Sequence, residues 1–203
     1  MQPIKAIIFD LGGPIVEWAS GMVEICREHE VAYGLAPDTL RVFLRGFLTR
    51  GGVGEFKTIQ EYIEATKPEL GLTTEQLAAV FDQANATMYA RPDMVRYITE
   101  LKKSYKIGLL SNFTADLEHY LKDIFHIAHL FDSVVSSYDV RIRKPDPRIY
   151  EYSLVELGVR AEEAVFIDDY EENTRAAEAL GMITVVFKDS LQCQRDLDII
   201  LNQ

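Results

Sequence analysis

The sequence has little cysteine, little positive charge and no long apolar run. Its two cysteines, Cys26 and Cys193, lie far apart and have no neighbouring cysteine or histidine at the spacing of metal ligands. Because disulfides are rare in reducing compartments, we expect two unpaired thiols and a cytoplasmic protein. No run approaches the ~18 consecutive apolar residues of a membrane-spanning helix, and the N-terminus passes almost directly into a strand, so we expect no membrane partner.

The shortage of positive charge excludes a second class of partner. Lysine and arginine number 21 against 32 aspartates and glutamates, a formal net charge of −11. Such a field repels the phosphate backbones of nucleic acids, and no basic cluster is long enough to offset it. We therefore expect no nucleic-acid partner. A small anionic substrate would need a locally positive pocket or a bound cation.

Apolar side chains, by contrast, are present in quantity and in order. They make up 48% of the 203 residues, enough for one α/β domain with a small insertion. The run Ala6–Phe9 reads as a buried strand, and it ends abruptly at Asp10, before Gly12, Gly13 and Pro14. In an open α/β sheet ligands bind beyond the carboxyl ends of the strands, so Asp10 is the first candidate for chemistry.

The next seventy residues are predicted to be helical. Apolar stripes at helical spacing cover 20–29 and 39–49, and the Gly51, Gly52, Gly54 cluster interrupts the chain after them. Thr58 with Glu61, and Thr73 with Gln76, form capping-box patterns that predict helices over 59–65 and 74–87. We predict a small all-helical unit at 17–88, inserted after the first strand of a core made of 1–16 and 89–203.

From residue 91 onwards strands and helices alternate. Strands are expected at 106–110, 133–135, 164–167 and 183–187, and helices at 92–104, 114–125, 147–157, 171–180 and 191–201. The helix at 147–157 has an N-cap at Asp146 and ends at Gly158. Such alternation predicts an α/β fold, a Rossmann-like parallel sheet with helices on both faces.

Polar groups collect at one edge of this predicted sheet. Three strands end in Asp10, in Ser111, and in the pair Asp168 and Asp169, while Lys144 precedes a helix and can reach the same edge. A carboxylate nucleophile, a hydroxyl, a cation and further carboxylates suit phosphoryl transfer through a covalent intermediate with a hard metal ion. Burying these charges unpaired would cost on the order of several kcal/mol, and a divalent cation would relieve the repulsion between the carboxylates.

This order of residues resembles the haloacid dehalogenase superfamily. The matching motifs are FDLGG, LLSN, Lys144 in RKPDP, and FIDDYEEN, with a helical insertion in the position of a C1 cap. Within that superfamily the chain resembles the compact bacterial phosphatases of the sugar-phosphate type. The resemblance implies a Mg²⁺-dependent phosphatase acting on a small phosphorylated metabolite; it sets no oligomeric state.

The resemblance also implies roles for individual residues. Asp10 would be the nucleophile that forms an aspartyl phosphate, and it would hold Mg²⁺ together with the main-chain carbonyl of Gly12 and the carboxylate of Asp169. Asp168 would contact the ligands of the metal, or would reach the metal through a water molecule. Asn173 stands where many relatives carry another acid.

The phosphoryl group would be held by three further residues. Ser111 and the main-chain amide of Asn112 would bind its oxygens, and Lys144 would neutralise charge in the transition state.

One position departs from the family pattern. Most phosphatases of the superfamily carry a second Asp as general acid and base where this chain has Gly12, and such help is worth about 10² to 10⁴ in rate. Three interpretations follow: a substrate with a good leaving group such as a sugar 1-phosphate or acyl phosphate, proton supply by Glu17 or a water it holds, or different or absent chemistry. The last includes a non-hydrolytic binding protein and a 2-haloacid dehalogenase, although dehalogenases lack the paired Asp of FIDDYEEN.

Substrate contacts outside the phosphate are expected from the helical insertion and its entry. Glu17, Trp18 and the loop at 51–55 are the candidates. Arg141 and Arg143 either add positive potential beside Lys144 or are ordinary solvated loop arginines.

Overall fold

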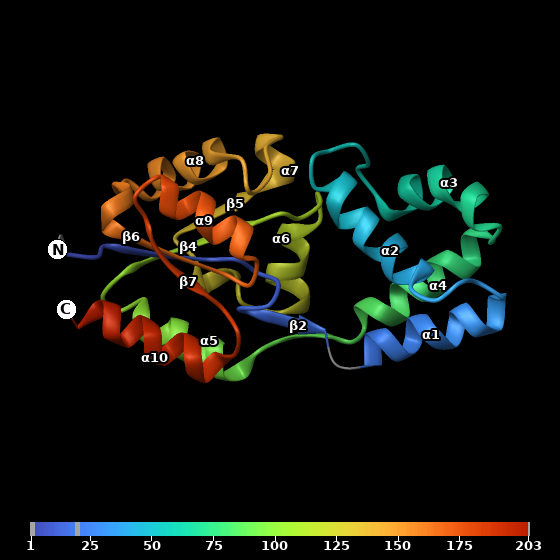
Figure 1. Ribbon diagram of the computed structural model, residues 1–203, viewed down its shortest axis with the longest axis horizontal. Helices are drawn as coiled ribbons and strands as arrows, with labels where there is room; N and C mark the ends of the chain where they lie inside the picture. Colours follow the sequence, from blue (N-terminus) through green and yellow to red (C-terminus); the bar gives the residue numbers. More distant parts are fainter. Residues whose placement is uncertain (1–2, 19–20, 203) are drawn as a thin grey trace.

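A five-stranded parallel sheet forms the centre of the protein (Figure 1). The structure is a computed structural model, and it describes residues 3–18 and 21–202, with only the backbone of Trp18. The strand order is β5-β4-β1-β6-β7. The strands are β1 (Ala6–Phe9), β4 (Lys106–Ser111), β5 (Ser133–Ser136), β6 (Ala164–Asp168) and β7 (Ile183–Val186).

The register of the sheet brings the strand ends to one level. Phe9 of β1 lies opposite Leu109 of β4 and Ile167 of β6, so the next residues, Asp10 and Asp168, stand side by side. The hydrogen bond from the Asp10 amide to the Ile167 carbonyl, 2.8 Å, extends this ladder past β1. The sheet therefore delivers these carboxylates to the same edge.

Helices cover both faces of the sheet, which confirms the predicted fold class. The side chains of β1 are fully buried and alternate between two hydrophobic clusters: Ile7 and Phe9 pack on one face, Ala6 and Ile8 on the other. Helices α5 (Pro92–Leu101) and α10 (Ser190–Leu201) lie on the first face, and α8 (Pro147–Leu157) and α9 (Glu171–Ala179) on the second (Figure 1). Short helical turns complete the core at α6 (Leu117–His119), η2 (Tyr120–Ile124), η3 (Ala128–Leu130), α7 (Ser137–Val140) and η4 (Ala161–Glu163).

A group of helices lies beyond the carboxyl ends of the strands and has a hydrophobic cluster of its own (Figure 1). Leu40, Phe43, Tyr62 and Leu77 are among its buried members. The Thr73 cap of the last helix is reciprocal, as predicted: its Oγ1 accepts from the Gln76 amide, and Gln76 Oε1 accepts from the Thr73 amide. The elements are α1 (Gly21–Tyr33), α2 (Thr39–Gly46), the π-helical turn η1 (Phe47–Gly51), α3 (Ile59–Leu70) and α4 (Thr74–Asn85).

The helices are joined to the sheet by an unpredicted two-stranded ribbon. Strands β2 (Val16–Trp18) and β3 (Met88–Ala90) pair antiparallel, and the helix expected over 74–87 ends at Asn85 to allow it. Strands of three residues are too short to show periodicity, and their partners lie seventy or more residues apart, so no local pattern indicates them.

Other local expectations need smaller corrections. The helix predicted at 114–125 is a short α-helix followed by the π-helical turn η2, and the helix predicted at 59–65 continues to Leu70. At Thr58 the capping box is incomplete, because the Glu61 carboxylate accepts from the Lys57 amide instead of the Thr58 amide. Cys26 and Cys193 are both buried and unpaired. Among the described helices, none combines the length and apolar character that crossing a bilayer requires.

Candidate active site

A buried lysine bridges two carboxylates at the carboxyl edge of the sheet. Lys144 Nζ lies 2.8 Å from Asp10 Oδ1 and 2.7 Å from Asp168 Oδ2. Lys144 and Asp168 are buried, and Asp10 is only 9% exposed. The predicted convergence of residues from three separate parts of the chain is therefore present for these three groups.

Asp168 is held firmly by its own surroundings. Its Oδ1 accepts a hydrogen bond from the Tyr170 amide at 2.8 Å, and the side-chain amide of Asn173 lies 3.0 Å from both of its oxygens. Lys144 also donates to Oδ2, so both oxygens of this carboxylate accept hydrogen bonds from the protein. Its geometry suits fixing the ammonium of Lys144 against Asp10.

Three carboxylates at this edge are close enough to share a metal ion. One oxygen each of Asp10, Asp168 and Asp169 lies within 4.8 Å of the others, and Asp169 is exposed on the rim of the site. Three carboxylates set against one ammonium leave two negative charges. Hard divalent cations take oxygen ligands of this kind, so the donor set fits Mg²⁺.

The pKa values of three charged groups in the cluster are raised. Burial raises the pKa of Asp10 to about 7, against the opposing attraction of Lys144. Burial and the neighbouring charge of Asp168 raise the pKa of Asp169 to about 6. Burial lowers the pKa of Lys144, but the charges of Asp10 and Asp168 outweigh this and raise it, so the side chain stays an ammonium.

The two glycines after Asp10 have different surroundings. A Cβ atom on Gly12 would have no heavy atom within 4 Å, so this position opens onto free space. A Cβ on Gly13 would lie 2.8 Å from the Asp169 carboxyl carbon, and Gly13 has φ +88°. Only glycine fits this backbone and this close approach, so Gly13 sets the position of Asp169.

Ser111 is the last residue of β4, and Asn112, the next residue, contacts Lys144. The Asn112 side chain accepts from the Lys144 amide at 2.9 Å and donates to the Lys144 carbonyl at 3.1 Å, which fixes the loop that carries the lysine. Ser111 is buried, and its hydroxyl makes no hydrogen bond to another residue within 3–18 or 21–202. The sequence placed both residues at this edge but gave no signal for the Asn112 clamp.

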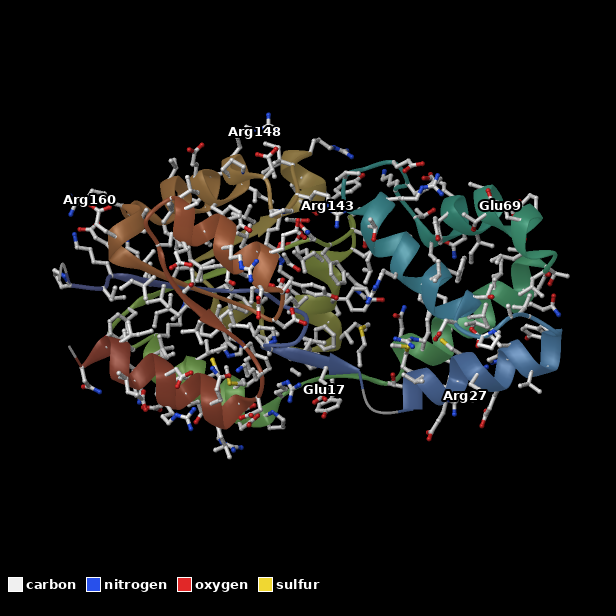
Figure 2. All side chains as sticks on the ribbon, viewed as in Figure 1. Glu17, Arg27, Glu69, Arg143, Arg148 and Arg160 are labelled. Carbon is white, nitrogen blue, oxygen red and sulfur yellow. The ribbon has the colours of Figure 1, made fainter. Side chains whose placement is uncertain are left out.

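Glu17 is not brought to the cluster. Its carboxylate pairs with Arg91 at 2.9 Å and accepts from the Tyr89 hydroxyl at 2.8 Å, on the outer edge of the molecule (Figure 2). Arg91 also donates to the Gly13 carbonyl at 2.8 Å, a contact that sequence reasoning missed. The side chain of Trp18 lies outside the described part of the chain.

The predicted loop at 51–55 does reach the core next to the strand ends. The Ser137 hydroxyl donates to the Gly52 carbonyl at 2.5 Å, and a Cβ on Gly51 would lie 3.0 Å from Thr114, two residues after Asn112. The helical group is thereby placed against the edge that carries Asp10.

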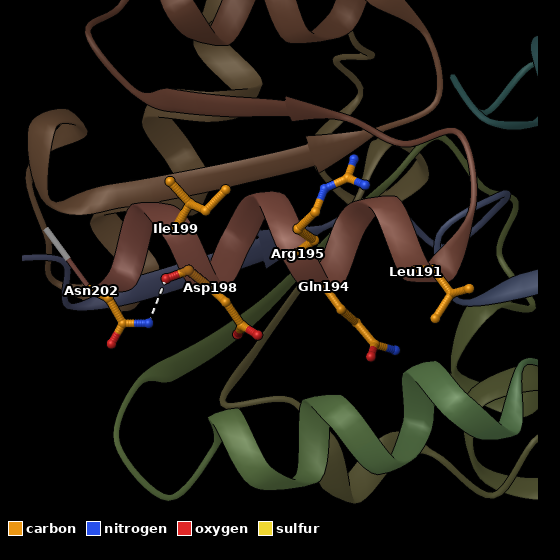
Figure 3. Close-up of a pocket in the computed structure, with 6 residues that line it drawn as sticks. All are labelled: Leu191, Gln194, Arg195, Asp198, Ile199 and Asn202. Carbon is orange, nitrogen blue, oxygen red and sulfur yellow. Dashed lines mark hydrogen bonds between the residues drawn. The ribbon is translucent and has the colours of Figure 1, made fainter.

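A hollow of about 540 Å³ lies on the outer surface of α10 (Figure 3). Its polar groups serve the local structure, since Asp198 accepts from Tyr97 and Arg195 pairs with Asp196. Its lining contains nothing like the three carboxylates and buried lysine found at the strand ends. The lining residues are Leu191, Gln194, Arg195, Asp198, Ile199 and Asn202.

Comparison with known proteins agrees with the motifs in the sequence. The model of the haloacid dehalogenase-like hydrolases matches residues 4–181. The chain is 29% identical to the sesquiterpene phosphatase astK of Aspergillus oryzae, over 92% of this chain and 91% of that protein. It is 30% identical to the glyceraldehyde 3-phosphate phosphatase of Methanopyrus kandleri, over 58% of this chain, and spans about half (52%) of that relative's length.

A solved structure shares the fold. The HAD family enzyme of Bacteroides thetaiotaomicron, in complex with magnesium and inorganic phosphate, superposes with a TM-score of 0.73 at 22% identity, covering 92% of this chain and 96% of that one. At this identity the likeness concerns the fold. Together with the family match over most of the sequence, these findings show that the chain belongs to the haloacid dehalogenase-like hydrolases and is a hydrolase.

Proposed function

We propose that the protein is a Mg²⁺-dependent phosphatase that hydrolyses a small phosphorylated metabolite, with Asp10 as the nucleophile. The observation that carries this proposal is the contact of Asp10 with Lys144 inside a cluster of three carboxylates. The phosphatase relative that aligns with 92% of the chain supports phosphate as the group attacked. The helical unit at 17–88 would act as a cap over this edge, in a protein of the cytoplasm.

The proposed reaction has two displacements. A carboxylate oxygen of Asp10 attacks phosphorus, forming an aspartyl phosphate as the bond to the leaving oxygen breaks; this oxygen departs as an anion and takes a proton from water. A water molecule then attacks the same phosphorus and loses a proton to solvent, which releases inorganic phosphate and restores the carboxylate. Mg²⁺ would be held by Asp10, Asp169 and the Gly12 carbonyl. Asp168 would contact these ligands or reach the ion through water, and the ion would supply positive charge for the phosphoryl oxygens.

The remaining groups would stabilise the transferred phosphoryl. Lys144, held by Asp168 and Asn112, stands in contact with Asp10 and can neutralise charge as it spreads over the phosphoryl oxygens. The free hydroxyl of Ser111 and the main-chain amide of Asn112 would bind those oxygens. Because Asp168 and Asn112 already hold Lys144, its ammonium would need little reorganisation during the reaction.

The open space at Gly12 restricts the choice of substrate. No acid occupies this position to protonate the leaving oxygen, and Glu17 is bound to Arg91 and Tyr89. A leaving group that needs little protonation, such as the anomeric oxygen of a sugar 1-phosphate or an acyl phosphate, would be hydrolysed best. We therefore expect sugar 1-phosphates to be better substrates than sugar 6-phosphates.

The test is phosphate release from a panel of phosphate esters, measured with Mg²⁺ and with EDTA. We expect turnover that needs Mg²⁺ and falls by about 10³ or more in Asp10→Asn, because the amide is not a nucleophile. No release from any ester would favour a non-hydrolytic binding protein of the same fold. Halide release from 2-haloacids in EDTA would identify a dehalogenase instead.

A further inference from the structure

Arg143 is a partly buried arginine one residue before Lys144. Within 3–18 and 21–202, its guanidinium makes no hydrogen bond or ion pair. The chain has a formal net charge of −11, so carboxylates are in excess, and seven of its twelve arginines pair with one. The arginines that do pair with carboxylates are Arg41, Arg50, Arg91, Arg148, Arg160, Arg175 and Arg195.

The carboxylate closest to Arg143 along the loop is already taken. Asp146 lies three residues away, but it forms a two-pronged contact with Arg148, through Nε at 3.0 Å and Nη2 at 2.7 Å. Lys144, the adjacent cation, is occupied by Asp10 and Asp168. Among the described residues, Arg143 therefore keeps its guanidinium donors unused, and unlike Arg141 it is not stacked on an aromatic ring.

The backbone that carries Arg143 is fixed on both sides. Its carbonyl accepts from the Asp146 amide at 2.9 Å, and the Asn112 side chain holds the peptide of Lys144. Arg141, two residues earlier, lies 4.3 Å above the Tyr138 ring and fills the place that a side chain on Gly54 would occupy. Figure 2 shows Arg143 at the junction between the core and the helical unit, on the side of the strand ends.

We propose that Arg143 binds a second negatively charged group of the substrate, separate from the phosphoryl group attacked by Asp10. The proposal rests on the function proposed above and narrows the substrate to a phosphate ester that carries a further phosphate or carboxylate. A guanidinium presents paired donors that match the two oxygens of either group. An unpaired arginine held beside the nucleophile's lysine has this recognition geometry available without breaking any existing ion pair.

The experiment compares three non-hydrolysable probes by calorimetry in saturating Mg²⁺. Methylphosphonate carries one anionic group, phosphonoacetate adds a carboxylate, and methylenediphosphonate adds a second phosphonate. We expect the wild-type protein to bind at least one of the two larger probes about tenfold more tightly than methylphosphonate. Which of them gains distinguishes a carboxylate from a phosphate as the second group.

The variants assign that gain to Arg143. Arg143→Gln should abolish most of the difference between probes and leave methylphosphonate binding unchanged, while Arg143→Lys should keep part of it. Arg96→Gln is the matched control, since Arg96 is also unpaired among the described residues but is exposed on α5. It should behave as wild type.

Two results would overturn the proposal: no difference between the probes in the wild type, or the same loss for all three probes in Arg143→Gln, which would indicate only a long-range field. Binding needs no turnover, so the two proposals can fail separately. A protein without phosphatase activity but with the Arg143-dependent difference refutes the function and keeps the anion site. An active phosphatase without the Arg143-dependent difference keeps the proposed function and refutes the anion site.

Discussion

Two adjacent glycines, Gly12 and Gly13, give the site its clearest test at the scale of single residues. Gly13→Ala introduces a Cβ 2.8 Å from the Asp169 carboxyl carbon at φ +88°, so Asp169 or the turn must move. We expect Mg²⁺ affinity to fall by about tenfold or more, because strain of roughly 1–3 kcal/mol falls on a proposed ligand. Calorimetric titration of the metal-free protein with Mg²⁺ measures this.

Gly12→Ala is the control, since its Cβ enters open space and the main-chain carbonyl is kept. Its Mg²⁺ affinity should stay close to that of the wild type. Equal affinities in Gly13→Ala and Gly12→Ala would show that Asp169 does not bind the metal from its present position.

At the same scale, the sequence predicted which residues gather but not how they hold one another. Asp10, Ser111 and Asp169 follow directly from strand ends and motif order. The contacts of Lys144 with Asp168, of Asn112 with the Lys144 peptide and of Arg91 with Gly13 join residues 24, 32 and 78 positions apart. Such contacts depend on packing that no local pattern records, and Glu17 looked available because its partner Arg91 is equally remote.

At the scale of elements, a pair of buried serines tests the contact between the helical unit and the core. Ser137 begins α7 and donates to the Gly52 carbonyl just after η1, whereas the hydroxyl of Ser153 in α8 has no partner in the described part of the chain. Ser137→Ala should lower the free energy of unfolding by about 1–3 kcal/mol, because a buried carbonyl loses its donor. Ser153→Ala should leave it unchanged or raise it, since an unsatisfied hydroxyl is removed.

Denaturant unfolding of both variants beside the wild type measures the difference. Both serines are fully buried, so loss of packing is comparable in the two. Equal destabilisation would mean that the hydroxyl of Ser137 contributes nothing beyond its volume.

Elements differ in how well sequence can predict them, for a physical reason. β1 was predicted with its observed bounds because both of its faces are buried, which leaves a continuous apolar run ended by a charge. The Asp146 and Thr73 caps are local hydrogen-bond patterns and were equally visible. β2 and β3 pair with each other across the whole helical unit, so neither segment carries a local sequence pattern that predicts its strand.

At the scale of the whole molecule, the crowded carboxylates link stability to pH. Asp10 has a folded-state pKa of about 7 and Asp169 of about 6, while both have values near 3.8 when unfolded. Between about pH 4 and pH 7 the folded state therefore binds more protons than the unfolded chain, so these groups make the metal-free protein less stable as pH rises. The loss reflects first the burial of these carboxylates and then the like charges placed beside them at the sheet edge.

Mg²⁺ should reverse this dependence. Metal ligation requires the ionised carboxylates, so stabilisation by Mg²⁺ should be small near pH 5 and grow as pH rises through about 7. At a hundredfold excess over Kd, bound ligand adds about 2.7 kcal/mol, which corresponds to a rise in Tm of roughly 5–10 °C for a chain of this size. Thermal unfolding at several pH values, in Mg²⁺ and in EDTA, measures the difference.

The variant Asp10→Asn is the control. Its metal-free stability should fall less as pH rises, because the carboxyl group whose pKa is raised most no longer titrates. A Mg²⁺ effect that is the same at every pH would show that the carboxylate cluster does not bind the metal. The grouping of three acids beside one lysine would then need another electrostatic explanation.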